Sequence, residues 1–402
     1  MEVFKTFIIY LIHLLFISYV LFDYFYLREK LFPITLPVIK YIQQNFSTYY
    51  FIKFNQFIAL LIKPDFCALF SVFYISITSN KYKAVKTLLF QIFGLYMLLF
   101  FKILMNDPRP YFVDNEIKCY ECYADFGNPS GHATCVWMFY GILLTDIYND
   151  VKFSKNKSLV NICKYLFLGI FLFLQVSIVF CRIFLGVHSF NQVLLGTVFG
   201  IYIYLIYLLQ CNDLVEHVFN FLRNTKISKV KKFIRLFFGF VLAIQVPVFI
   251  YQYLEKDVPE LWVQNVLTQC PNMKEYNKFY KACFRGCAAI SFGFGCLYGL
   301  ILLDKTRKLI LEDYRIQEEN KKTHNNILNL SNLLKAFLVM FIFIFIFLIF
   351  THVYNIGRFV DMPVIYDKYY SMVIGGFISI LIIIFIFPLI YQADQGKKIK
   401  KE

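Results

Sequence analysis

Three short runs between Lys102 and Gln192 carry the side chains of this sequence that are best suited to chemistry. Each run lies at the end of an apolar segment, so we expect the three to meet at one face of a membrane. Together they supply a lysine, two arginines, two histidines and a Ser-Gly turn. Permanent cations bind phosphate oxygens, backbone N–H groups add donors, and imidazoles act as nucleophile and proton donor, so the set predicts a site for a phosphoryl group. The runs are Lys102-Ile-Leu-Met-Asn-Asp-Pro-Arg109-Pro110, Asn128-Pro129-Ser130-Gly131-His132 and Cys181-Arg182-Ile-Phe-Leu-Gly-Val-His188-Ser-Phe-Asn-Gln192.

Each run also has a purely structural explanation when it is taken alone. Lys102 ends an apolar segment, where a lysine often extends its ammonium group to the membrane interface. Ser130 could cap the following helix, with His132 incidental. His188 could pack at the interface. However, two of the six histidines fall inside these runs, and the three runs share one predicted face. This coincidence favours a functional site.

The composition indicates a membrane protein. The chain has 402 residues, of which 59% are hydrophobic, and a mean hydropathy of +0.59. Long apolar runs alternate with short polar loops, which predicts an all-α, polytopic transmembrane bundle of about ten helices. The net charge of +15 does not indicate nucleic-acid binding, because the basic residues fall largely in alternate loops. The expected spans cover residues 7–21, 56–78, 86–104, 133–148, 163–180, 192–210, 233–253, 283–303, 333–353 and 370–391.

The chain shows no linker or internal repeat, so we expect one integral membrane domain over residues 1–402. Within it, residues 1–55 would form an extra N-terminal anchor helix and a lumenal loop. Residues 56–210 would form the catalytic core, and residues 211–402 a helical extension. Lysine-rich loops are typical of the cytosolic side, and they occur around residues 81–86, 152–164, 223–232, 305–322 and 397–401. This places the three runs on the opposite, lumenal side.

The cysteines do not predict a metal site. The chain holds eleven, mostly inside apolar segments, where cysteine behaves as a small buried hydrophobe. Cys119 and Cys122 form a C-x-x-C pair in a polar loop, but no second pair at zinc-finger spacing exists. Because the cations of the three runs can neutralise a phosphate by themselves, we expect neither a metal nor another cofactor.

The patterns K-x6-R-P, P-S-G-H and C-R-x5-H-x3-Q resemble the signature of the type 2 phosphatidic acid phosphatase (PAP2) superfamily, which includes vanadium haloperoxidases. The resemblance implies a PAP2-type helical core over residues 56–210. It also implies that His188 is a nucleophile forming a phosphohistidine and that His132 is a general acid. The phosphate would be bound by Lys102, Arg109 and Arg182, with Ser130 and Gly131 completing its cradle.

Two residues depart from the superfamily pattern. Cys181 stands in place of the usual serine, and Gln192 in place of the aspartate that orients the nucleophilic imidazole. A glutamine carbonyl can still accept the Nδ1–H bond, but it brings no negative charge. The sequence His188-Ser-Phe-Asn-Gln192-Val193, followed by a small-residue helix, resembles instead the glucose-6-phosphatase catalytic subunit family. The run Arg109-Pro110-Tyr111-Phe112 is similar to that family too. The family usually has nine spans, so the leading helix would be an addition.

The expected function is therefore that of a membrane phosphatase acting on a phosphomonoester, first of all glucose 6-phosphate. The alternatives are a phosphatase for phosphatidate, a sphingoid base phosphate or an isoprenoid diphosphate, and, from other classes, a transporter or a silent homologue. The complete set of Lys, Arg and His residues argues against a silent homologue, and the lack of repeats gives a transporter no support. The expected partners are the phosphorylated substrate and membrane lipids. A transporter partner is conceivable, but no residue identifies it.

Two short patterns bear on location. Asn45-Phe-Ser47 is a glycosylation sequon on the side expected to be lumenal. Lys398 and Lys400 near the end of the chain resemble a dilysine retrieval signal, although a basic tail beside a membrane would look the same. Together they favour the endoplasmic reticulum membrane, with a lumenal site and a cytosolic C-terminus.

Overall fold

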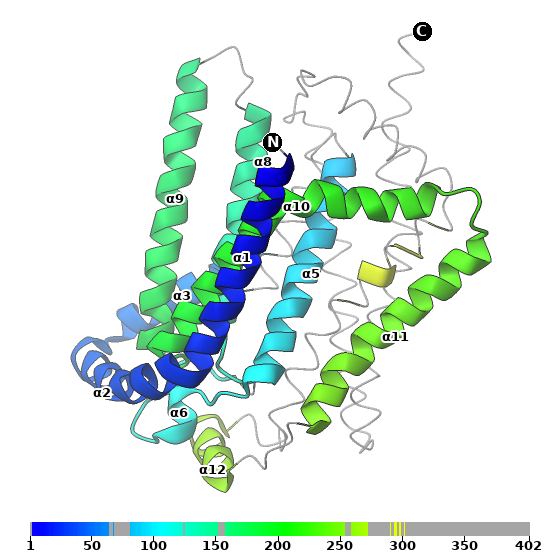
Figure 1. The fold of residues 1–402 in the computed structure, drawn as a ribbon. Helices are drawn as coiled ribbons and strands as arrows, with labels where there is room; N and C mark the ends of the chain where they lie inside the picture. The colour runs from blue at the N-terminus through cyan, green and yellow to red at the C-terminus, as the bar shows by residue number, and fades with distance from the viewer. Residues whose placement is uncertain are drawn as a thin grey trace. The chain divides into compact units, whose positions relative to one another are not determined.

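The protein is described here from a computed structural model that covers residues 2–63, 67, 81–123, 125–151, 157–253, 259–271 and single positions between 290 and 301. Across these residues the regular structure is helical and contains no strand, which confirms the all-α class (Figure 1). The expected spans at 333–353 and 370–391 lie outside the described residues, as do most of those at 56–78 and 283–303.

The described helices follow one another with short connections. In chain order they are α1 (Glu2–Phe22), η1 (Asp23–Leu27), α2 (Arg28–Phe46), α3 (Tyr49–Leu61), α5 (Lys81–Met105), α6 (Pro110–Val113), α7 (Gly131–Cys135), η2 (Val136–Gly141), α8 (Ile142–Val151), α9 (Lys157–Phe184), α10 (Phe190–Arg223), α11 (Lys229–Tyr253) and α12 (Glu260–Gln269).

Four helical stretches among the described residues are long and apolar enough to cross a membrane. They cover Val3–Phe46, Lys86–Val113, Val160–Phe184 and Phe190–Arg223. A membrane span needs about 20 apolar residues, so each of these stretches suffices by length. The described part of the chain thus supports a polytopic protein, while the expected number of about ten helices is not confirmed.

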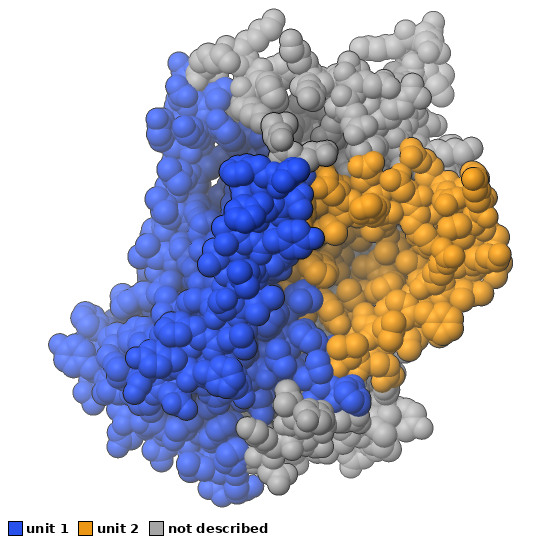
Figure 2. Space-filling model, viewed as in Figure 1, with its two compact units in different colours: residues 1–67, 97–209, 247–284 blue, residues 68–96, 210–246, 285–402 orange. Residues whose placement is uncertain are grey.

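The chain divides into two compact units (Figure 2). The first contains residues 1–67, 97–209 and 247–284, shown in blue, and it holds every residue of the three sequence runs. The second contains residues 68–96, 210–246 and 285–402, shown in orange where described. The candidate site is therefore a property of the first unit.

The lumenal loop expected after the anchor helix within residues 1–55 is largely helical, because η1, α2 and α3 follow α1 there. Pro33 and Pro37 locally disfavour a helix, since proline removes a helical hydrogen bond. Both nevertheless lie inside α2. In the same helix Thr35, Ile39 and Gln43 are buried at intervals of four residues, so they form one stripe facing the protein. Tertiary packing therefore outweighs the local propensity.

Gln43 shows what this packing achieves. Its amide Nε2 donates to the carbonyl of Lys118 at 2.8 Å and to that of Phe184 at 2.9 Å, and its Oε1 accepts from N of Lys118 at 2.9 Å. The helix direction changes between α1 and α2, so that α2 lies across the lower end of α1 (Figure 1). The N-terminal helices are thus tied to the loop before the second run and to the end of α9.

α9 is the central helix of the first unit, since it contacts α2, α3, α7, η2 and α8. α10 lies in close backbone contact with the second run. A Cβ on Gly196 would lie 2.5 Å from the carbonyl oxygen of Ser130, so only glycine allows this approach. Thr134 strengthens it by donating from Oγ1 to the carbonyl of Gly196 at 2.9 Å. The second and third runs are therefore held together by backbone contact.

Candidate active site

The first run places its two cations on either side of a chain reversal. Lys102 lies in the last turn of α5, and Asn106, with φ of 46°, turns the chain after that helix. Arg109 is extended, as expected for a residue before proline, and Pro110 opens α6. The side chains of Lys102 and Arg109 are both buried, and Nζ of Lys102 donates to the carbonyl of Phe126 at 2.6 Å.

Asp125 joins these two cations. Its Oδ2 lies 3.0 Å from Nζ of Lys102, and its Oδ1 lies 2.5 Å from Nη2 of Arg109. Nε of Arg109 also donates to the backbone carbonyl of Asp125 at 2.8 Å. Burial alone would raise the pKa of Asp125, but Arg109 and Lys102 hold that pKa well below its usual range. Asp125 is therefore a carboxylate at any physiological pH.

The third run places Arg182 and His188 at the two ends of a tight turn. Arg182 lies in the last turn of α9, and its carbonyl accepts from N of His188 at 3.3 Å. Gly186, with φ of 73°, supplies the left-handed residue that the turn requires. Nη1 of Arg182 forms an ion pair with Oε2 of Glu121 at 2.7 Å. Burial would raise the pKa of Glu121, but Arg182 lowers it.

The ring of Tyr123 brings the runs together. Cζ of Arg109 lies 4.6 Å from its centroid and Cζ of Arg182 lies 5.2 Å from it, both at cation–π distance. The ring of His132 packs edge-on against Tyr123, with centroids 6.1 Å apart. One residue from each of the three runs therefore contacts the same aromatic ring.

His188 is held in one tautomer by its neighbours. Nε2 of Gln192 donates to the carbonyl of Pro108 at 2.6 Å, which can only accept, so Oε1 of Gln192 must face the other way. That oxygen lies 3.3 Å from Nδ1 of His188 and accepts its proton. Nη1 of Arg109, a permanent donor, lies 3.1 Å from Nε2 of His188. Nε2 is therefore the unprotonated ring nitrogen, and its electron pair faces Arg109.

Both histidines are uncharged at neutral pH. Burial lowers the pKa of His188 well below its usual value, and the charges of Arg109 and Arg182 lower it further. Burial likewise lowers the pKa of His132, followed by the charges of Arg182 and Arg109. A neutral imidazole is the form that can attack phosphorus.

The second run lies against α10. N of Ser130 donates to the carbonyl of Gln192 at 2.9 Å, so this backbone donor is already used. A Cβ on Gly131 would lie 4.0 Å from Cε of Lys102, so Gly131 faces the first run. The side chain of Ser130 makes no cap bond to α7, which argues against a purely capping role.

Several buried polar atoms at this place have no hydrogen-bond partner among the described residues. They are Oγ of Ser130, Nε2 of His132 and both Nε and Nη2 of Arg182. A buried donor without a partner costs about 1–3 kcal/mol. A tetrahedral anion with several acceptor oxygens would satisfy these groups beside the free electron pair of His188. The structure thus brings together all the sequence-predicted residues in an arrangement that can bind and receive a phosphoryl group.

Comparison with known proteins agrees with this geometry. Residues 83–216 match the PAP2 superfamily. This segment is a PAP2 superfamily domain. It contains all three runs, and the resemblance drawn from them is confirmed over these residues. The matched segment also contains the three buried cations of the site, Lys102, Arg109 and Arg182.

Two curated relatives match part of the chain. "Glucose-6-phosphatase 2" of Mus musculus is 25% identical over 181 residues, which cover 40% of this chain and 50% of the relative. The protein of the same name from Homo sapiens is 25% identical over 182 residues, with the same coverage. The chain thus spans about half the length of the curated relatives that it matches. No solved structure matches the chain.

Sequence reasoning missed the acidic and aromatic partners of the PAP2 site. The missed residues are Asp125, Glu121 and Tyr123, which all lie in the loop before the second run. They contact the cations of the first and third runs. Acidic residues occur throughout residues 107–125, but their positions in the sequence do not show which of them reaches a cation. A buried cation needs a compensating anion, and this rule would have pointed to the nearest acidic loop.

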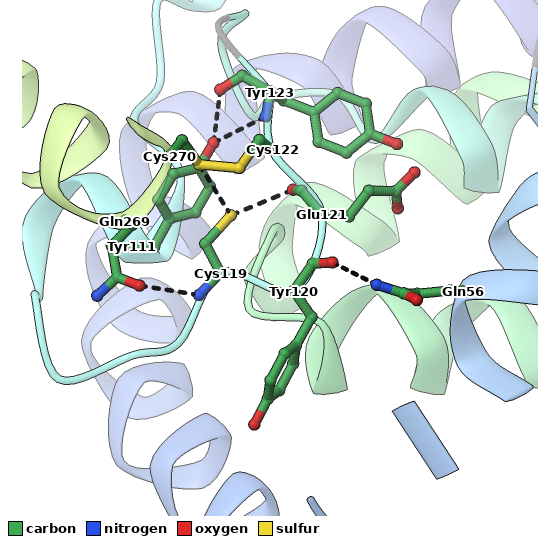
Figure 3. Close-up of a disulfide and its surroundings, with 9 residues drawn as sticks. All are labelled: Gln56, Tyr111, Cys119, Tyr120, Glu121, Cys122, Tyr123, Gln269 and Cys270. Carbon is green, nitrogen blue, oxygen red and sulfur yellow. Dashed lines mark hydrogen bonds between the residues drawn. A yellow bond between two sulfur atoms is a disulfide. The ribbon is translucent and has the colours of Figure 1, made fainter. Parts of the chain in front are cut away.

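The C-x-x-C pair has a role that the sequence did not show. Cys122 forms a disulfide with Cys270, which follows α12, and Sγ of the free Cys119 lies 3.7 Å from Sγ of Cys270 (Figure 3). Among the described residues, these three cysteines have sulfur atoms close enough to hold a metal, but two of them are joined covalently. The disulfide ties α12 to the loop that carries Glu121 and Tyr123.

Proposed function

We propose that this protein is a membrane-bound phosphohydrolase that cleaves a phosphomonoester through a phosphohistidine at His188. The observation that carries the proposal is the state of the His188 ring. Gln192 accepts a hydrogen bond from Nδ1–H, and the electron pair of Nε2 faces the donor Nη1 of Arg109. This is the arrangement of an activated nucleophile next to a cation that can bind the group under attack.

The proposed reaction has two steps. Nε2 of His188 attacks phosphorus, and the P–O bond to the leaving group breaks while His132 gives that oxygen a proton. Water then attacks the phosphohistidine, loses a proton to His132 and releases orthophosphate. His132 begins neutral, but the bound phosphate charge would raise its pKa and favour the protonated form. Its Nε2 has no hydrogen-bond partner among the residues that the structure describes, so it is open to the leaving oxygen.

The three cations would stabilise the charge that spreads over the phosphoryl oxygens in the transition state. Nε and Nη2 of Arg182 have no hydrogen-bond partner in the described part of the chain, and they suit a bidentate contact with two oxygens. Arg109 touches the nucleophilic nitrogen, and Lys102 shares Asp125 with it. Preorganised cations of this kind are the main contribution a protein makes to phosphoryl transfer.

Glucose 6-phosphate is the substrate we propose first. The support is the likeness to two proteins named glucose-6-phosphatase 2 and the run from His188 to Val193. We further propose that the chain lies in the endoplasmic reticulum membrane with its active site lumenal. A lumenal site would require a transporter to deliver a sugar phosphate, which would be its partner.

The test compares substrates and labels the enzyme. Purified protein is given glucose 6-phosphate, mannose 6-phosphate and phosphatidate in parallel, and phosphate release is measured. We expect glucose 6-phosphate to give the highest kcat/KM and rapid quenching to show label on His188. Preference for phosphatidate would replace the sugar with a lipid substrate and keep the mechanism. No label, together with full activity of His188→Ala, would overturn the mechanism itself.

A further inference from the structure

Gln192 does not stand alone behind the nucleophile. Its Nε2 atom lies 3.4 Å from Oδ2 of Asp107, in addition to its bond to Pro108. The side chain of Asp107 is 1% exposed, so its charge is little screened by water. A carboxylate therefore lies directly behind the amide that accepts the proton of His188.

Asp107 is itself fixed by the N-terminal helices. Nε of Arg28, the first residue of α2, lies 2.5 Å from Oδ1 of Asp107. The Arg28 side chain is 32% exposed, so solvent screens its charge more than that of Asp107. The backbone carbonyl of Asp107 also accepts from N of Gly127 at 2.8 Å. The carboxylate is thus held in place, with its second oxygen turned to Gln192.

Glycine at position 127 keeps this arrangement possible. A Cβ there would lie 2.4 Å from Oε1 of Gln192 and 2.6 Å from its Nε2. The amide of Gln192 is therefore clamped between the backbone at Gly127, the carbonyl of Pro108 and the carboxylate of Asp107. A flip of the amide would turn Oε1 toward the carbonyl of Pro108 and the carboxylate of Asp107, which are both acceptors, so the NH2 group stays on that side.

We propose that Asp107 is a positioning residue that supplies, through Gln192, the negative charge that orients and stabilises the ring of His188. It polarises the amide of Gln192, so that Oε1 accepts more strongly from Nδ1–H when the ring becomes positive on phosphorylation. Arg28 anchors Asp107, which makes the N-terminal helices part of the catalytic apparatus. The proposal rests on the function proposed above.

The test is a double-mutant cycle on the rate of phosphohistidine formation. Asp107→Asn keeps the size of the side chain and removes its charge. We expect a loss of about 10–100-fold, as is typical of the outer partners of a functional histidine. Gln192→Glu alone should also be slow, because two adjacent buried carboxylates force one of them to take up a proton. The combination Asp107→Asn/Gln192→Glu brings a negative charge next to Nδ1–H without a second carboxylate beside it. It should therefore be faster than Gln192→Glu alone, while the second Glu oxygen, which faces the carbonyl of Pro108, keeps it slower than the wild type.

The sign of this coupling separates positioning from a merely structural role. If Asp107 only supports the fold, Asp107→Asn will lower the rate equally in both backgrounds, and the proposal is overturned. The pH profile gives a second readout. Removing a negative charge behind His188 should lower the pKa of its ring further, so the acid limb of kcat/KM should move to lower pH. The ring already faces the positive or titratable groups of Arg109, Arg182, Lys102 and His132.

Asp146→Asn is the matched control, because it removes a buried carboxylate that bonds to the hydroxyl of Tyr207 at 2.8 Å. We expect it to label at the wild-type rate. Wild-type protein that carries no phosphate on His188 would refute the proposed function. A labelled wild type with equally fast labelling of Asp107→Asn would refute only the role of Asp107.

Discussion

Oδ1 of Asp125 lies 2.5 Å from Nη2 of Arg109, so a principal anion-binding group of the site is already paired with an anion of its own chain. The same carboxylate bonds to Lys102, and Glu121 pairs with Arg182. Each phosphate-binding cation therefore has a carboxylate partner within the chain when no substrate is bound, and two carboxylates serve three cations. A phosphate must either displace these carboxylates or share their cations.

The first prediction concerns Asp125→Asn. The substitution keeps the shape but removes the charge that competes for Arg109 and Lys102. Orthophosphate and vanadate should then inhibit about tenfold more tightly or better, since tenfold corresponds to about 1.4 kcal/mol. The measurement is the inhibition constant of each anion. Glu116→Gln is the control, because Glu116 is an exposed acid of the same loop that pairs with Lys40. Unchanged or weaker inhibition in Asp125→Asn would show that the carboxylate does not compete.

The second prediction separates the two histidines. His132→Gln should reduce turnover of an alkyl phosphate by roughly 10²–10⁴, because the leaving oxygen then departs without a proton. The loss should shrink for a nitrophenyl phosphate, whose oxygen needs little protonation. The measurement is kcat/KM for both substrates, with His13→Gln as the control, since His13 bonds to Tyr202. An equal loss on both substrates would mean that His132 binds phosphate and does not donate the proton.

The third prediction concerns stability against pH. The pKa values of His132 and His188 are lowered in the folded protein, mainly by burial, so the unfolded chain binds more protons. Their contribution to stability is present above the unfolded pKa of about 6.5 and is lost as the pH falls below it. Each histidine should remove up to about 1.4 kcal/mol per pH unit in that range.

The measurement is the apparent Tm of phosphate-free protein between pH 7.5 and 5. Wild-type protein should lose stability steeply below pH 6.5, and His132→Gln/His188→Asn should lose much less. Parallel curves for the two proteins would show that these imidazoles are not held in the neutral form.

The cations and histidines of the site could be predicted from the sequence, because residues such as Lys102, Arg109 and His188 fall in three short runs that share one predicted membrane face. Their anionic partners could not. Asp125 reaches Arg109 only because the intervening loop folds back, and no periodicity in the sequence encodes that path. The contribution of Arg28 was equally hidden, since it depends on α2 packing against the site.

The helices show the same division. The apolar runs of α9 and α10 were predicted because their length and hydropathy are local properties of the chain. α2 was missed, because its prolines and polar residues locally favour a loop. Its helical form depends on partners far along the chain, such as the carbonyls of Lys118 and Phe184 that accept from Gln43. Contacts of this kind are decided by the fold and cannot be read from composition.

The last prediction uses the free thiol beside the disulfide. Sγ of Cys119 lies 3.7 Å from Sγ of Cys270, and burial raises the pKa of Cys119 to about 11, so the thiol stays protonated and slow to exchange. In Cys122→Ser, the partner of Cys270 is removed, and Cys119 becomes its nearest cysteine among the described residues. In an oxidising compartment it should then form a disulfide with Cys270, which peptide mapping by mass spectrometry would detect.

The combination Cys119→Ser/Cys122→Ser should leave Cys270 reduced and the loop that carries Glu121 and Tyr123 untied from α12, with a lower apparent Tm. A reduced Cys270 in Cys122→Ser would show that Cys119 cannot reach bonding geometry and that the loop depends on Cys122 alone.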